Sequence, residues 1–328
     1  MGDLRTTYMG LELSSPIIAG SSGLNNNLRN LLDAEKHGAG AVVLKSLFEE
    51  QINHEMYSAV NSDSQNAVYP EAMDYLSNYT KQHSVANYLK LIREAKENLS
   101  IPVIASINCL SANEWINFAS QIEEAGADAL ELNLFILPSD PFRSGEENEK
   151  VYFDIIQEVR KKITIPLSVK ISFYFSGLGK TILHLSWTGI SGLVLFNRFY
   201  SPDIDINEME VTTANVFSSP NEIYMPLRWI AMLSDHVQCD LCASTGVENG
   251  ESAVKLILAG ATAVQVTSAL YKYGISKITD INDQISDWMK VHGYTSINDF
   301  KGKMSLKKAQ NPAAYERVQF MKHFAGIE

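Results

Sequence analysis

The sequence predicts a closed α/β barrel, in which eight parallel strands alternate with helices. In four places a glycine is followed by a short apolar run that ends at or near a polar side chain; these residues are Lys45, Asn133, Asn197 and Thr267. The glycine is typical of a helix end, where the backbone turns left-handed. The apolar run is typical of a parallel strand buried on both faces. Because the active sites of such barrels lie at the carboxyl ends of the strands, the polar residues predict a site there.

Eight strands can be assigned along the chain, at residues 16–19, 41–44, 102–108, 129–134, 165–170, 192–196, 239–243 and 263–266. Helical patterns lie between most of them, for example at residues 113–125, 152–162 and 251–258. Strands that alternate with helices indicate a parallel sheet, and eight of them indicate closure into a (β/α)8 TIM barrel. Residues 6–13 predict an N-terminal hairpin that covers the barrel floor, and residues 278–292 predict a closing amphipathic helix.

Three connections from strand to helix exceed the usual two to six residues. They follow the second, fourth and sixth strands, at residues 46–85, 135–149 and 198–224. Long loops on this rim of a barrel usually form the walls of the substrate site. No linker, low-complexity segment or block of charge divides the chain, so we expect one domain over residues 1–328.

The composition argues against several classes of partner. The chain has 328 residues and a net charge of −11, from 27 Lys and Arg against 38 Asp and Glu, which disfavours binding to nucleic acid. No apolar stretch reaches the roughly 20 residues that span a bilayer, and no signal peptide is evident, so we expect a cytoplasmic protein without membrane contact. Three cysteines fit a reducing compartment, and scattered histidines predict no metal site. Cys239 and Cys242 form a C-x-x-C within a predicted strand, where two small strand residues are the favoured interpretation.

The residues at the strand ends form a chemically consistent set. Lys45 and Lys170 end the second and fifth strands, and amides end the third, fourth and sixth, at Asn108, Asn133 and Asn197. Small residues follow the last two strands, at Thr245, Gly246, Thr267 and Ser268. Backbone N–H groups at such positions, before a helix, suit a phosphate. Two lysines near the barrel axis need anionic or strongly accepting partners. The set predicts a cofactor with a phosphate tail and an electron-rich ring, although any one residue alone could be a solvated strand end.

Several stretches resemble the dihydroorotate dehydrogenases, which are FMN-dependent barrel enzymes of pyrimidine biosynthesis. The similarity extends over essentially the whole chain and is clearest at residues 8–16, 22–23, 39–46, 127–134, 168–170, 245–246, 258–270 and 293–302. Residues 105–109 are closer to the dihydropyrimidine dehydrogenase branch. The resemblance implies that FMN is bound by Ser22, Gly23, Lys45, Ser46, Asn108, Asn133, Lys170, Thr245, Gly246, Thr267 and Ser268. It also implies that Asn133 and Asn197 lie between the flavin and a pyrimidine, with Lys45 at the flavin ring.

One departure from the family falls on the catalytic base. After Leu134 the family continues with Ser, a catalytic Cys or Ser, Pro and Asn, whereas this chain has Ile136 at the base position and Pro138 at the asparagine position. Ile136 cannot accept a proton. The nearest alternatives are Ser139, for which a turn role is favoured over a catalytic one, and Cys109. The asparagine-rich substrate motif expected after the second strand is also unclear, at residues 67–74.

Two functions follow from this pattern. The first is an FMN oxidoreductase acting on a dihydropyrimidine-like small molecule, with Lys45, Asn133, Asn197 and Ser139 as candidate catalytic residues and activity on dihydroorotate open. The second is a flavin-binding sensor or partner subunit without turnover. Retention of the lysines and asparagines favours the enzyme. A homodimer is possible, and the sequence names neither the electron acceptor nor the true substrate.

Overall fold

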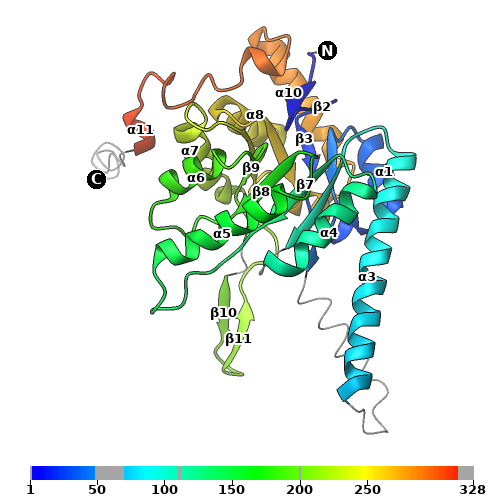
Figure 1. Ribbon diagram of the computed structural model, residues 1–328. Coiled ribbons are helices and arrows are strands. Elements are labelled where there is room, and N and C mark those ends of the chain that lie inside the picture. The colour runs from blue at the N-terminus through cyan, green and yellow to red at the C-terminus, as the bar shows by residue number, and fades with distance from the viewer. Residues whose placement is uncertain (1, 49–69, 109–111, 199–200, 317–328) are drawn as a thin grey trace.

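Eight parallel strands close into a barrel in the computed structural model, which describes residues 2–48, 70–108, 112–198 and 201–316 (Figure 1). In chain order they are β3 (Ile17–Ala19), β4 (Ala41–Val43), β6 (Val103–Asn108), β7 (Ala129–Asn133), β8 (Leu167–Ile171), β9 (Gly192–Leu195), β12 (Asp240–Ser244) and β13 (Ala263–Val266). Each pairs with the next, and β13 pairs with β3 to close the ring. The predicted barrel is confirmed. A short strand, β5 (Leu47–Phe48), adds to the carboxyl end of β6.

Helices surround the barrel and bury its outer face. They are α1 (Leu28–Lys36), α3 (Pro70–Asn98), α4 (Ala112–Glu124), α5 (Gly145–Arg160), α6 (Leu178–Ser186), α7 (Tyr224–Leu233), α8 (Gly250–Ala259) and α10 (Lys277–His292), with the shorter α9 (Ser268–Tyr273) and α11 (Ala313–Glu316). Local sequence sets their ends: Ser144 and Glu147 form a capping box at α5, and Gly293 ends α10 with a φ of 71°. Within the described residues, no helix is long and apolar enough to cross a membrane.

The N-terminal hairpin covers the floor of the barrel, as predicted. Strands β1 (Thr6–Tyr8) and β2 (Leu11–Leu13) pair antiparallel, and the Met9 amide donates to Asp240 Oδ2 at 2.8 Å. Tyr8 is buried among inward side chains of the strands. A Cβ added at Gly192 would lie 2.7 Å from Tyr8 Oη, so the glycine on β9 makes room for this ring. The hairpin and the inward side chains around Tyr8 therefore form an apolar cluster at the barrel floor.

All three long loops differ in part from the prediction. Residues 70–85 were expected in a loop but belong to α3. This helix begins at Pro70, and proline is tolerated at the first position of a helix because its missing donor would be unpaired there anyway. The loop after β9 contains a hairpin of its own, β10 (Pro202–Asp205) and β11 (Glu210–Thr213), before the short helix η2 (Pro220–Ile223). Figure 1 shows this hairpin projecting away from the barrel. The loop after β7 ends at α5, which begins earlier than expected.

Candidate active site

A cavity of about 600 Å³ lies at the carboxyl ends of the barrel strands. It is lined by every residue that the sequence predicts for the cofactor, namely Ser22, Gly23, Lys45, Ser46, Asn108, Asn133, Lys170, Thr245, Gly246, Thr267 and Ser268. Asn197 lines it as well. The tips of all eight strands meet at one edge of the barrel, which is why residues more than 200 positions apart share one cavity.

The loops after β3 and β4 are tied together by a buried amide. Asn25 Nδ2 donates to the carbonyl oxygens of Ala19, Gly20 and Val43, and the Asn25 carbonyl accepts from the Lys45 amide at 3.2 Å. These bonds place Ser22 and Gly23 beside Lys45. Sequence reasoning missed Asn25. Its position in the short helix η1 (Gly23–Asn26), which follows a strand, carried no recognisable signal.

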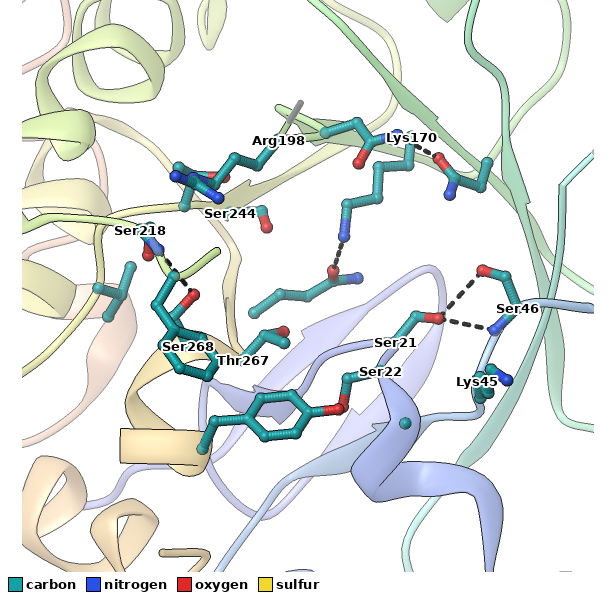
Figure 2. A pocket seen from close by; sticks show the side chains of 18 of the residues that line it. Ser21, Ser22, Lys45, Ser46, Lys170, Arg198, Ser218, Ser244, Thr267 and Ser268 are labelled. Carbon is teal, nitrogen blue, oxygen red and sulfur yellow. Dashed lines mark hydrogen bonds between the residues drawn. The ribbon is translucent and has the colours of Figure 1, made fainter. Parts of the chain in front are cut away.

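A row of hydroxyl groups continues this wall of the cavity. Ser21 Oγ lies 3.0 Å from Ser46 Oγ and accepts from the Ser46 amide, and Ser46 Oγ lies 2.7 Å from Ser106 Oγ. Figure 2 shows Ser21, Lys45 and Ser46 on one side of the cavity, with Ser218 and Ser268 on the other. The serine row joins three neighbouring strands at the level of Lys45.

The opposite wall comes from the loops after β12 and β13. Thr245 and Gly246 both have positive φ, of 82° and 76°, and Thr245 Oγ1 donates to the Phe196 carbonyl at 3.2 Å. A Cβ at Gly246 would lie 2.3 Å from the Ile223 nitrogen, so this position requires glycine. Ser268 begins α9, whose first backbone N–H groups have no acceptor within the helix. The two loops offer N–H groups and hydroxyls at one corner of the cavity.

Two polar pairs lie between these walls. Lys170 is 7% exposed, and its Nζ donates to Gln265 Oε1 at 2.8 Å. Asn197 Nδ2 donates to Asn133 Oδ1 at 2.7 Å. The cavity therefore carries the Lys170 side chain, labelled in Figure 2, and two amides that bond to each other.

Arg198 shapes the rim of the cavity, and sequence reasoning missed it. Its Nε donates to Glu222 Oε2 at 2.8 Å, and its terminal nitrogens donate to the carbonyls of Asn215 and Val216 at 2.9 and 2.8 Å. These bonds hold the segment that carries Phe217, whose ring lies 5.5 Å from that of Tyr271. The sequence feature that could have indicated Arg198 is its position directly after Asn197.

The loop after β7 turns away from the cavity after Phe135. Phe135 lines the cavity, but Ile136 packs against the core around the barrel, and its amide donates to Tyr152 Oη at 3.0 Å. Pro138 and Ser139 are exposed, and neither is among the described residues that line the cavity. Ser139, a candidate catalytic residue, therefore lies outside the described lining of the cavity, and its catalytic role stays a prediction.

The cysteines offer no reactive group to the described part of this site. Cys242 is buried in the barrel floor, and burial raises the pKa of its thiol. Burial also raises the pKa of Cys239 to about 12, so both thiols stay protonated at neutral pH. Cys109 and residues 67–69 of the expected substrate motif lie outside the described residues.

Comparison with known proteins gives a consistent result. A family model described as dihydroorotate dehydrogenase matches residues 3–289. A dihydroorotate dehydrogenase B (NAD(+)) catalytic subunit of Thermoplasma acidophilum is 30% identical over 309 residues, covering 92% of this chain and 99% of the relative. A putative dihydroorotate dehydrogenase A (fumarate) of Aeropyrum pernix is 28% identical, covering 92% and 97%. The NAD-dependent dihydropyrimidine dehydrogenase subunit PreA of Escherichia coli K12 is 24% identical, covering 92% and 76%.

Proposed function

Because the chain belongs to the dihydroorotate dehydrogenase family of oxidoreductases, which act on CH–CH bonds, we propose that it binds FMN in the cavity and acts on a dihydropyrimidine-like substrate. The observation that carries this proposal is the convergence of Lys45, Lys170 and the loops after β12 and β13 on one cavity. A phosphate at one end and a ring between two lysines would use each of these groups.

The phosphate end fits the loops at Thr245–Gly246 and Thr267–Ser268. The first turn of α9 and the backbone at Gly246, which lines the cavity, would offer N–H donors to a phosphate. Thr267 and Ser268 add hydroxyls at the same corner. This cradle would hold the phosphate of FMN through backbone N–H groups and hydroxyls.

The part of the cavity near the two lysines fits the ring of FMN. FMN, when bound, supplies a ring that accepts or returns a hydride. The Lys170 ammonium, held by Gln265, would stabilise negative charge on such a ring. Lys45 would do so from the wall formed by the loops after β3 and β4. Asn133 and Asn197 would orient a flat substrate through their amides, since their mutual hydrogen bond fixes both side chains.

The substrate is proposed to differ from dihydroorotate. In place of the family's base, Ile136 packs into the core, and the aromatic ring of Phe135 lines the cavity. Loss of a general base typically costs roughly 10²–10⁴-fold in rate. We therefore expect slow turnover of dihydroorotate. The outward course of the loop after β7 also favours the second candidate function, a flavin-binding subunit without turnover. A cytoplasmic location and a homodimer stay predictions.

Anaerobic mixing of the FMN-loaded protein with dihydroorotate, with dihydrouracil and with buffer alone separates these functions. Bleaching of the flavin by dihydrouracil, with slow or no bleaching by dihydroorotate, is the expected result. Bleaching by dithionite but by neither substrate would favour the subunit without turnover. Rapid bleaching by dihydroorotate would contradict the altered substrate.

A further inference from the structure

A buried chain of three polar side chains leads from the cavity lining into the barrel. Lys170 Nζ donates to Gln265 Oε1 at 2.8 Å, and Gln265 Nε2 donates to Glu131 Oε2 at 2.6 Å. Glu131 and Gln265 are each 1% exposed. Lys170 and Gln265 line the cavity. Glu131 is not among the described residues that line it. A carboxylate without contact to the cavity is thus connected to a cation at its floor.

The bridging amide has one orientation that satisfies both ends. A carboxylate only accepts hydrogen bonds and an ammonium only donates them. Glu131 therefore turns Nε2 of Gln265 toward itself, which turns Oε1 toward Lys170. The reversed amide would set a donor against the ammonium and an acceptor against the carboxylate. The charge of Glu131 thereby sets the acceptor that holds Lys170.

The surroundings of Glu131 make Lys170 its main electrostatic partner. Burial raises the pKa of Glu131, and the positive charge of Lys170 and the hydrogen bond from Gln265 oppose that shift. Tyr8, Tyr88 and Cys242 also feel the charge of Glu131, but burial raises the pKa of each, so they are neutral. Glu131 Oε1 has no hydrogen-bond partner in the described part of the chain. A buried carboxylate with so few local donors depends on the lysine for its charge.

We infer that Glu131 is a positioning residue, whose buried carboxylate acts through the Gln265 amide to hold the Lys170 ammonium at the cavity floor and to offset part of its charge. For the effect on the cofactor, this inference rests on the proposed FMN site. The coupling between Glu131 and Lys170 is a property of the chain itself and needs no flavin.

The first test is an NMR titration of the flavin-free protein labelled with [13Cδ]glutamate, with the Glu131 signal assigned by its loss in Glu131→Gln. Lys170→Met should raise the pKa of Glu131 by about one unit or more, which is the size of effect that a nearby opposite charge produces. Lys170→Arg should restore it toward the original value. If Lys170→Met does not fold, Gln265→Leu should shift the same signal in the same direction, because its hydrogen bond also lowers this pKa.

A matched control is available near the start of β7, the strand that carries Glu131. Lys96 pairs with Asp128, just before β7, at 2.7 Å. Lys96→Met also removes one lysine charge, but it should leave the Glu131 titration unchanged. Equal Glu131 titration in the parent protein, Lys170→Met and Gln265→Leu would overturn the inference.

The second test measures the midpoint potential of bound FMN in Glu131→Gln. The amide preserves the shape and can still accept from Gln265, so a purely structural role would leave the potential unchanged. Removal of a negative charge coupled to Lys170 should shift the potential to a more positive value. An unchanged or more negative potential would contradict the inference. Absence of FMN would contradict the proposed function. The NMR titration would still test the coupling between Glu131 and Lys170.

Discussion

Asn197 Nδ2 donates a 2.7 Å hydrogen bond to Asn133 Oδ1, which joins the tips of β9 and β7 across the end of β8. In this arrangement the bond occupies the oxygen of Asn133 and one N–H of Asn197. Asn133 then presents its nitrogen, and Asn197 its oxygen, to whatever ligand lies between the strand tips.

Loss of this bond should weaken the substrate step more than the binding of FMN. Asn197→Ala removes one amide and frees the other, so we expect roughly a tenfold loss in kcat/KM, the size of one net hydrogen bond. Asn133→Ala should cost a similar amount, and the double variant should cost less than the sum, since each single change breaks the same bond. Steady-state kinetics with the substrate that bleaches the flavin measures this. Strict additivity would show that the two amides act independently.

Lys45 should matter more than either cysteine of the described chain. Lys45→Ala removes a cation from the cavity wall and should weaken FMN binding or slow flavin reduction. Cys239→Ser and Cys242→Ala should leave both nearly intact, because both thiols are protonated at neutral pH and lie outside the described lining of the cavity. Flavin fluorescence during titration of the flavin-free variants provides the comparison. Loss of binding in the cysteine variants alone would refute the assignment of the site.

Gly246 should tolerate no side chain. Gly246→Ala places a Cβ 2.3 Å from the Ile223 nitrogen at a positive φ, so we expect a loss of at least about 1 kcal/mol in the free energy of unfolding and weaker FMN binding. Gly177→Ala is the matched control, since its Cβ would meet nothing within 4 Å and its φ is −119°. Denaturant unfolding of both variants tests this. Equal stability of the two would mean that the backbone does not approach so closely.

Restoring a thiol at the family's base position should help little. Ile136 packs into the core and does not line the described cavity, so Ile136→Cys should raise dihydroorotate oxidation by much less than the roughly 100-fold that a general base can contribute. Phe135→Cys, which places a thiol in the cavity lining, is the informative counterpart. A large gain from Ile136→Cys would show that the loop follows the ordinary path of the family.

The barrel and the membership of its cavity were predictable because both depend on local pattern and on parallel topology. A glycine-led apolar run predicts a strand such as β7, and parallel strands bring their polar tips, such as Asn133 and Lys170, to one edge. The loop after β7 was not predictable. Its direction depends on a hydrogen bond from Ile136 to Tyr152, which lies in a helix that begins nine residues later.

Contacts across the closed barrel were equally unpredictable from the sequence. Gln265 and Glu131 are 134 positions apart and meet only because the barrel closes. Arg198 finds Glu222 and two carbonyls only after an intervening hairpin brings the chain back. In each case the partner of the side chain follows from tertiary geometry alone.

The most direct test of the account is the identity of the chromophore in the purified protein. We predict about one FMN per chain, released by denaturation and identified by chromatography and mass spectrometry. The reason is that the cavity brings two lysines together with the loops proposed to hold a phosphate, at Thr245–Gly246 and Thr267–Ser268. The same measurement on Lys45→Ala and Gly246→Ala should return less FMN per chain. Recovery of no flavin, after incubation with excess FMN, or of FAD without FMN, would contradict the account.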